Sequence, residues 1–182
     1  MRKIIYTKSV SLDGYIEDQK GTIDWTTPSE ELHRHFNDRE LEVDTHLYGR
    51  KVYEVMQYWE DADQDLDYMK EYARLWQKQK KIVFSTTMDQ VKSGYELRNS
   101  VNPDEIRQWK KLTGKNMIVG GASLASSFME HGLVDEIHLY IPPVLLGGGK
   151  PMFPLNQKLD LEFMESQIFP GGVMMLKYQI KS

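Results

Sequence analysis

Three features of the sequence predict an α/β fold with a mostly parallel central sheet, helices on both faces and an antiparallel C-terminal hairpin. Short apolar runs rich in β-branched residues alternate with amphipathic segments of helical period. Several runs stop at a glycine or a hydroxyl residue directly before a helix, as in βα units. The end of the chain differs, because its strand candidates follow one another without a helix between the last two.

The first elements are a strand and a helix. Residues 3–10 are rich in β-branched and aromatic types and lead to the turn dipeptide Asp13-Gly14. Further on, Thr27 is expected to cap a helix, with Pro28 at its first position and Glu30 completing a capping box. Long and apolar side chains continue that helix at helical spacing: Leu32, Phe36, Arg39 and Val43.

The next elements repeat the strand and helix pattern. Residues 46–48 form a short apolar run that breaks at Gly49, and residues 50–56 resume helical chemistry. A second amphipathic helix is predicted by apolar residues at i, i+3, i+4 and i+7, namely Met69, Tyr72, Ala73 and Trp76. A buried strand over residues 81–85 follows it.

The second half of the chain carries the clearest strand, glycine and helix unit. Asn102 and Pro103 predict the start of a helix that leads to a strand at residues 117–119. That strand stops at Gly120-Gly121 before another helix. Three strand candidates end the sequence, with a hairpin expected between the last two at residues 170–172: residues 134–141, 159–168 and 173–181.

Composition limits the function classes. The 182 residues, 40% hydrophobic and 27% charged, suit one domain spanning residues 1–182. A formal charge of −4 with mixed signs argues against nucleic acid and membrane partners. Without cysteine, and with five scattered histidines, no metal site is expected and redox chemistry needs a borrowed cofactor. The first residues lack a signal peptide pattern, so a cytoplasmic location is the simplest expectation.

Three strand ends are candidate ligand sites. Ligands of open α/β sheets collect at the carboxyl ends of parallel strands, where helix N-termini present free N–H groups. The Gly120-Gly121 turn is suited to a pyrophosphate, and Arg50 and Lys51 to the 2′-phosphate that distinguishes NADP from NAD. Taken alone, a double glycine after a strand is more often a tight turn, and basic residues in a first helical turn usually point to water; their joint occurrence favours a dinucleotide.

Two common phosphate-binding motifs are absent. Residues 147–150 read Gly-Gly-Gly-Lys, but the G-x-x-x-x-G-K-[ST] spacing is missing and Pro151 follows the lysine. This excludes a P-loop kinase or ATPase. The G-x-G-x-x-G fingerprint is missing as well, so a dinucleotide needs another glycine arrangement.

The motifs together resemble a known family. They are Ser11-Leu12-Asp13-Gly14, Tyr48-Gly49-Arg50-Lys51, Ile118-Val119-Gly120-Gly121-Ala122-Ser123-Leu124, Gly132-Leu133-Val134-Asp135-Glu136 and the segment Pro142–Gly149. Their order and spacing resemble the reductase (C-terminal) domain of bacterial riboflavin biosynthesis and, more distantly, dihydrofolate reductase. The resemblance spans nearly the whole chain and implies the three-layer dihydrofolate-reductase-like fold.

The resemblance also implies NADPH as cofactor and hydride transfer to a small heterocyclic or sugar-derived substrate. The cofactor contacts that it implies are Gly49, Arg50, Lys51, Ser85, Gly120, Gly121, Ala122, Ser123 and Leu124. It places Asp13 near the reacting end of the substrate, although Asp-Gly is also an ordinary turn dipeptide. A homodimer is implied, to which Met174 and Met175 are expected to contribute apolar surface.

Dihydrofolate reductase suggests further substrate residues. Its pattern of a tryptophan, a proline and an acidic residue is similar to Trp25, Pro28 and Glu30, which would make Glu30 the carboxylate that orients a pterin-like ring. Arg34 would then bind a substrate phosphate. The alternative is that Glu30 caps the helix or pairs with Arg34 at i, i+4 on a wet face. Asp13, Glu30 or an ordered water remain open as the proton donor.

The chain also departs from the family pattern. The zinc deaminase motifs that often precede this domain in riboflavin enzymes are absent, and only Arg34 and Arg39 are candidates for a phosphate site. His33 and His35 are interpreted as boundary packing without a catalytic role. Two alternative functions stay open: a non-catalytic NADP-binding module and a dihydrofolate-reductase-type pterin reductase.

Overall fold

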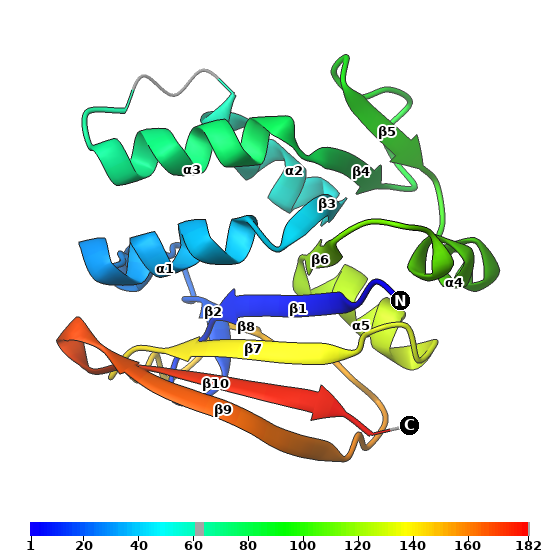
Figure 1. The fold of residues 1–182 in the computed structure, drawn as a ribbon. Coiled ribbons are helices and arrows are strands. Elements are labelled where there is room, and N and C mark those ends of the chain that lie inside the picture. The colour runs from blue at the N-terminus through cyan, green and yellow to red at the C-terminus, as the bar shows by residue number, and fades with distance from the viewer. Residues whose placement is uncertain (61–63, 182) are drawn as a thin grey trace.

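A central eight-stranded sheet forms the middle layer, in the order β5-β4-β3-β6-β1-β7-β10-β9 (Figure 1). This computed structural model describes residues 1–60 and 64–181. The strands of the sheet are β1 (Ile4–Ser9), β3 (Val43–Gly49), β4 (Lys80–Phe84), β5 (Tyr95–Arg98), β6 (Asn116–Gly120), β7 (Glu136–Ile141), β9 (Leu161–Phe169) and β10 (Val173–Ile180). The short strands β2 (Tyr15–Glu17) and β8 (Lys150–Pro151) pair separately.

Six neighbouring strands, from β5 to β7, run parallel. β10 runs in the opposite direction and pairs antiparallel with both β7 and β9. The turn between β9 and β10 is residues 170–172, so the predicted hairpin is confirmed. β1 lies between β6 and β7, which puts the first strand at the centre of the sheet.

Helices cover both faces, as predicted. They are α1 (Glu30–Glu40), α2 (Arg50–Met56), α3 (Asp67–Lys78), α4 (Pro103–Lys111) and α5 (Ala122–Glu130). Ile106 of α4 and Phe128 of α5 belong to the largest core cluster, which includes Leu47 of β3. The next residue, Tyr48, lies on the opposite face, because side chains alternate along a strand, and clusters there with Trp76 of α3.

α1 begins two residues later than its cap was predicted. Ser29, not Thr27, is the N-cap, and its side chain accepts a hydrogen bond from the Leu32 backbone N–H. Thr27 instead donates its hydroxyl to the Asp24 carbonyl. Glu30 is therefore the first helical residue, so the predicted capping box is wrong. Serine caps as well as threonine does, and Pro28 fits equally well just outside a helix.

Two other expectations change. Met175 is completely buried, so it supplies core and not surface, whereas Met174 is 40% exposed. The edge strand β5 was not predicted; its half-buried residues give no clear alternation. By contrast, Asn102 caps α4 as predicted, accepting hydrogen bonds from the backbone N–H groups of Asp104 and Glu105. Among the described residues no helix has the length and apolar character needed to cross a bilayer.

Candidate functional site

The three candidate turns lie together at the carboxyl ends of β4, β3 and β6, which are adjacent strands. We call residues 49–51, 85–87 and 120–123 the turn edge. An added Cβ at Gly49 would lie 3.8 Å from the Gly120 carbonyl oxygen and 3.8 Å from the Leu124 Cβ, so two of the turns are in contact. The fold therefore brings together the residues that the sequence named as cofactor contacts.

The two glycines after β6 are needed for different reasons. A Cβ at Gly120 would come within 3.0 Å of Tyr48 Cδ1 and 3.1 Å of Val52 Cγ1, so there is little room for a side chain. Gly121 has φ +106°, which side chains rarely adopt. It is the N-cap of α5 and no side chain caps that helix, so the first N–H groups of α5 are not satisfied by a cap. This turn can receive an anionic group on backbone N–H donors.

Arg50 connects two of the turns. Its guanidinium donates to Thr87 Oγ1 at 3.3 Å and to Glu54 Oε1 at 2.8 Å, and its side chain is 54% exposed. Ser85 Oγ accepts hydrogen bonds from the backbone N–H groups of Thr87 and Met88, which fixes that turn. The exposed Arg50 cation and the exposed Thr87 hydroxyl thus lie beside the Gly49 turn, with the buried Ser85 hydroxyl behind them, a combination suited to a phosphate.

A cavity of about 590 Å³ opens on the face of the sheet that α1 covers. Its walls come from β1, α1, α3 and β7, and include Thr7, His33, Phe36, Trp59, Tyr72 and Tyr140. It lies next to the turn edge: Met56 at the end of α2 and Ile118 in β6 line it, and these elements carry Arg50 and Gly120. Gly120 comes two positions after Ile118 in β6, so their Cα atoms are about 7 Å apart along the strand.

Two charged groups that line the cavity, Arg39 and Glu40, already have partners. Arg39 contacts Glu42 at 2.9 Å and His138 Nδ1 at 3.4 Å. Glu40 contacts His46 Nε2 at 3.1 Å. Burial acts to raise the pKa of Glu40, but the charge and hydrogen bond of His46 lower it overall. Glu40 is therefore held as a carboxylate that is occupied by another residue.

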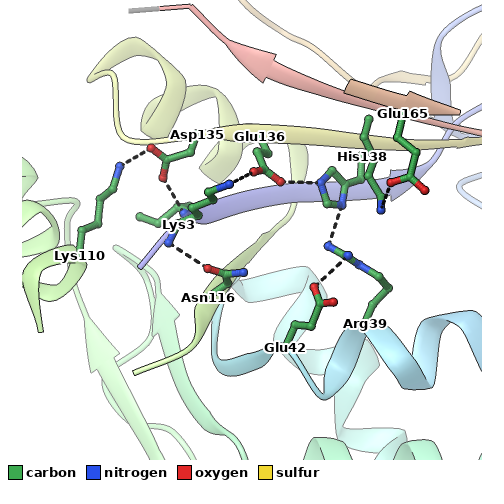
Figure 2. A network of polar contacts seen from close by, with 11 residues as sticks. Lys3, Arg39, Glu42, Lys110, Asn116, Asp135, Glu136, His138 and Glu165 are labelled. Atoms are coloured by element: carbon green, nitrogen blue, oxygen red, sulfur yellow. Dashed lines mark hydrogen bonds and ion pairs between the residues drawn. The ribbon is translucent and has the colours of Figure 1, made fainter. Parts of the chain in front are cut away.

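Figure 2 shows how Arg39 is connected to a chain of polar contacts through His138. His138 Nε2 lies 2.9 Å from Glu136 Oε2, and Lys3 Nζ donates to the same carboxyl group at 2.5 Å. The hydrogen bond from His138 lowers the pKa of Glu136 to about 2, although burial opposes the shift and Lys3 adds to it. A carboxylate only accepts, so Nε2 carries the proton and Nδ1 accepts from Arg39. Burial lowers the pKa of His138, which favours this neutral form.

Glu30 and Arg34 pair with each other outside the cavity. Glu30 Oε1 accepts from Arg34 Nε at 2.9 Å and from Nη2 at 2.8 Å. Their side chains are 60% and 52% exposed, and neither is among the residues that line the cavity. This is the i, i+4 pair that the sequence offered as the alternative to a substrate site. Starting α1 at Glu30 leaves that residue on the wet face, because His33 and Phe36 occupy the inner face.

Asp13 and Trp25 also lie outside the cavity lining. The exposed Asp13 carboxylate accepts from the backbone N–H groups of Leu146 at 3.1 Å and Gly147 at 2.8 Å. Its pKa is lowered by a hydrogen bond with Ser11 and by these two contacts. Asp13 thus fastens the first turn to the glycine segment at residues 147–149. Trp25 is half-buried, and its Nε1 has no hydrogen-bond partner among the described residues.

Sequence reasoning missed most of the residues that line the cavity, although it named Arg39 as a candidate for a phosphate site. His33 was interpreted as packing, yet it lines the cavity, and Tyr72 and Met69 do so from α3. A signal existed for Arg39, because it lies on the apolar stripe of α1, where a charged residue is unexpected. No sequence pattern connected α1 with His138 and Tyr140 of β7.

The comparisons agree with this geometry. The pattern of the RibD C-terminal domain matches residues 2–175. The uncharacterized protein YyaP of Bacillus subtilis is 36% identical over 97% of this chain and 94% of its own length.

Two solved structures share the fold. A putative riboflavin biosynthesis protein from Shewanella sp. PV-4 has a TM-score of 0.78 at 24% identity, over 99% of both chains. Dihydrofolate reductase from Enterococcus faecalis, complexed with NADP(H), has a TM-score of 0.67 at 15% identity, over 99% of this chain and 97% of its own. The chain belongs to the RibD C-terminal domain family and has the dihydrofolate-reductase-like fold.

Proposed function

We propose that this protein is an NADPH-dependent reductase of a small heteroaromatic substrate that carries no phosphate group. The observation that carries the proposal is the position of the turn edge directly beside a cavity lined by aromatic side chains. In this arrangement the turn edge binds the nucleotide and the cavity binds the substrate. The fold is shared with a dihydrofolate reductase complexed with NADP(H).

The turn edge fits NADPH by three tests. Gly120 lets the turn pack closely against Tyr48 and Val52, and Gly121 supplies the positive φ that leads the backbone into α5, where a pyrophosphate can approach. The uncapped N-terminus of α5 adds N–H donors. Arg50, with Ser85 and Thr87 beside it, can hold the 2′-phosphate. When bound, NADPH supplies the hydride, and this chain supplies binding, orientation and the exclusion of water from the cavity.

The phosphate-free substrate follows from the charges. Arg34 does not line the cavity, and Arg39 is engaged by Glu42 and His138. Lys8 also lines the cavity, but burial lowers the pKa of its ammonium group, which disfavours the charged form that a phosphate needs. A substrate phosphate at Arg39 would have to displace its partners. Aromatic walls favour a flat ring instead.

The first experiment is a titration with NADPH and NADH, followed by quenching of tryptophan fluorescence. We expect NADPH to bind more tightly, and Arg50→Ala to weaken NADPH about tenfold or more while changing NADH little. Arg107→Ala is the matched control, since Arg107 is 51% exposed and pairs with Asp104 on α4. No binding of either nucleotide at millimolar concentration would contradict the proposal.

A second experiment separates catalysis from binding alone. Oxidation of NADPH is followed at its absorbance while unphosphorylated pterins, pyrimidinediones and dihydrofolate are added. Turnover of any of these supports a reductase, and consumption of dihydrofolate with competition by antifolates would favour the pterin reductase. Tight NADPH binding without turnover of any ring compound would favour the non-catalytic binding module.

We also propose that the protein forms a homodimer through β9. This nine-residue strand is at the edge of the sheet, and all its residues except Phe169 are exposed. Phe163 and Ile168 are 58% and 69% exposed, and long apolar edge strands tend to pair with another chain. Sedimentation should give twice the chain mass, and Ile168→Lys should give the single mass. A wild-type monomer at micromolar concentration would contradict the proposal.

A further inference from the structure

We propose that His33 determines substrate specificity: its imidazole hydrogen-bonds the substrate ring, and the cavity therefore prefers an uncharged oxo-heteroaromatic ring to a more basic diamino ring. The inference rests on the proposed reductase function, because that function assigns the substrate to this cavity. It deepens the proposal by naming the residue that recognises the ring and the electronic class of the ring.

His33 is the polar centre of an aromatic wall. It lies on the inner face of α1, lines the cavity and is only 7% exposed. Four aromatic rings lie within 6.4 Å of its own ring, centroid to centroid: Phe36 at 6.4 Å, Trp59 at 6.2 Å, Tyr68 at 5.0 Å and Tyr72 at 5.6 Å. Each of these four residues also lines the cavity. A flat ring entering here meets hydrocarbon on several sides and the imidazole as a polar contact.

The imidazole of His33 carries an unsatisfied ring nitrogen. Nδ1 is buried and has no hydrogen-bond partner among the described residues, where buried polar atoms are nearly always bonded. Other histidines on this side of the sheet are occupied: His35 contacts the Tyr140 hydroxyl at 2.9 Å, and His138 contacts Glu136 and Arg39. His33 thus combines burial, an unsatisfied polar atom and a place in the cavity wall.

The charges around His33 select the class of ring. Burial lowers the pKa of His33, with the Asn37 side chain opposing the shift in part, so the imidazole is neutral near pH 7. Each nitrogen of a neutral imidazole can make one hydrogen bond, so the ring can donate to the C=O or accept from the N–H of a lactam. A protonated ring needs a carboxylate. The carboxylate that lines the cavity, Glu40, is occupied by His46, and Arg39 would repel a cation.

The experiment is calorimetric titration of the full chain, without nucleotide, with pteridine-2,4-dione and with 2,4-diaminopteridine. We expect the dione to bind at least about tenfold more tightly, a difference of the size that one hydrogen bond provides. His33→Phe should reduce dione affinity about tenfold and remove the preference. His131→Phe is the matched control, because His131 is exposed at the end of α5, and it should change neither affinity.

A measurement on the wild-type chain covers the case in which His33→Phe fails to fold. The imidazole ¹⁵N resonances of the five histidines are followed as the dione is added. The His33 resonances should shift most. The proposal is overturned if these resonances stay fixed while the dione binds, if the diamino ring binds as tightly, or if neither ring binds at millimolar concentration. Failure of NADPH to bind would instead refute the proposed function, since the ring titrations contain no nucleotide.

Discussion

The turn edge and the cavity are neighbours, but they recognise ligands in different ways. The turn edge presents the uncapped backbone N–H groups at the start of α5, with Arg50 as its main charged side chain. The cavity is made of side chains from several elements that are far apart in the sequence. Backbone recognition depends on a few glycines and on the strand order, whereas side-chain recognition depends on each wall residue. The first belongs to the fold and the second to this particular chain.

The largest effect is expected where the backbone itself binds. Gly121→Val forces a β-branched side chain into φ +106° and should shift the turn that directs the N–H groups of α5. We expect NADPH affinity to fall about a hundredfold, on the order of 3 kcal/mol, which matches the strain typical of such backbone positions. Fluorescence titration measures it.

Gly94→Val is the control for that prediction. Gly94 has φ +91° and an added Cβ meets nothing within 4 Å, so the same kind of strain is introduced away from the turn edge. It should lower stability and leave NADPH affinity unchanged. Equal losses of affinity in both variants would mean that Gly121 matters for folding and not for the nucleotide.

The stability of the folded protein should be sensitive to acid beside the cavity, where Glu136 contacts the lining residue His138. The pKa of Glu136 is lowered to about 2 in the folded protein and returns to its ordinary value on unfolding. The stabilisation is therefore present above pH of about 4.5 and is lost as the pH falls towards 2; it amounts to about 2 kcal/mol once solvent screening is allowed for. His138, whose pKa is lowered by burial, adds a loss in the same direction below its ordinary value.

Urea unfolding between pH 7 and pH 3 measures this effect. Glu136→Gln should flatten the part of the curve below pH of about 4.5, since glutamine does not titrate. If the variant and the wild type lose stability in parallel, other carboxylates account for the acid sensitivity, and the chain in Figure 2 does not.

Removing the N-cap of α1, a helix that lines the cavity, should have a smaller effect on stability. Ser29→Ala removes the hydrogen bond to the Leu32 N–H, and should lower the free energy of unfolding by about 1 kcal/mol. Thr27→Ala, which affects only a bond to the Asp24 carbonyl before the helix, should lower it less. Thermal unfolding of the two variants compares them; a larger loss for Thr27→Ala would favour the cap that the sequence predicted.

The smallest effect is expected at the residue that the sequence offered as a substrate carboxylate. Glu30→Gln breaks an exposed ion pair with Arg34 and should change stability by about 0.5 kcal/mol or less, with no change in ring binding. Calorimetric titration of the variant with pteridine-2,4-dione tests this. A tenfold loss of affinity would return Glu30 to the site and make the cavity an incomplete description of it.

The sequence predicted the fold and the turn edge because their signals are local. Apolar period and glycine position identify each βα unit, and adjacent parallel strands place their carboxyl ends side by side. The position of the α1 cap was missed because Thr27 and Ser29 are both acceptable caps, and only packing chooses between them.

The cavity was not predictable because its residues meet only after folding. His33 follows Leu32 on α1, and Tyr72 and His138 come from segments with no sequence relation to it. A lone histidine on an amphipathic helix is more often packing than a ligand contact. What distinguishes His33 is a buried ring nitrogen without a partner, and a sequence does not show that.

The central place of β1 affects how the protein is made. Lys3 and Ile4 bond to Asn116 and Asp135, which lie 113 and 131 residues further along the chain. During synthesis the apolar segment at residues 4–6 therefore leaves the ribosome before both of its neighbouring strands. The second of these strands follows roughly ten seconds later. Throughout that time its two edges are unpaired, which makes the nascent chain a client for chaperones that bind extended apolar segments. β1 gains its second partner only after β7 has been synthesised.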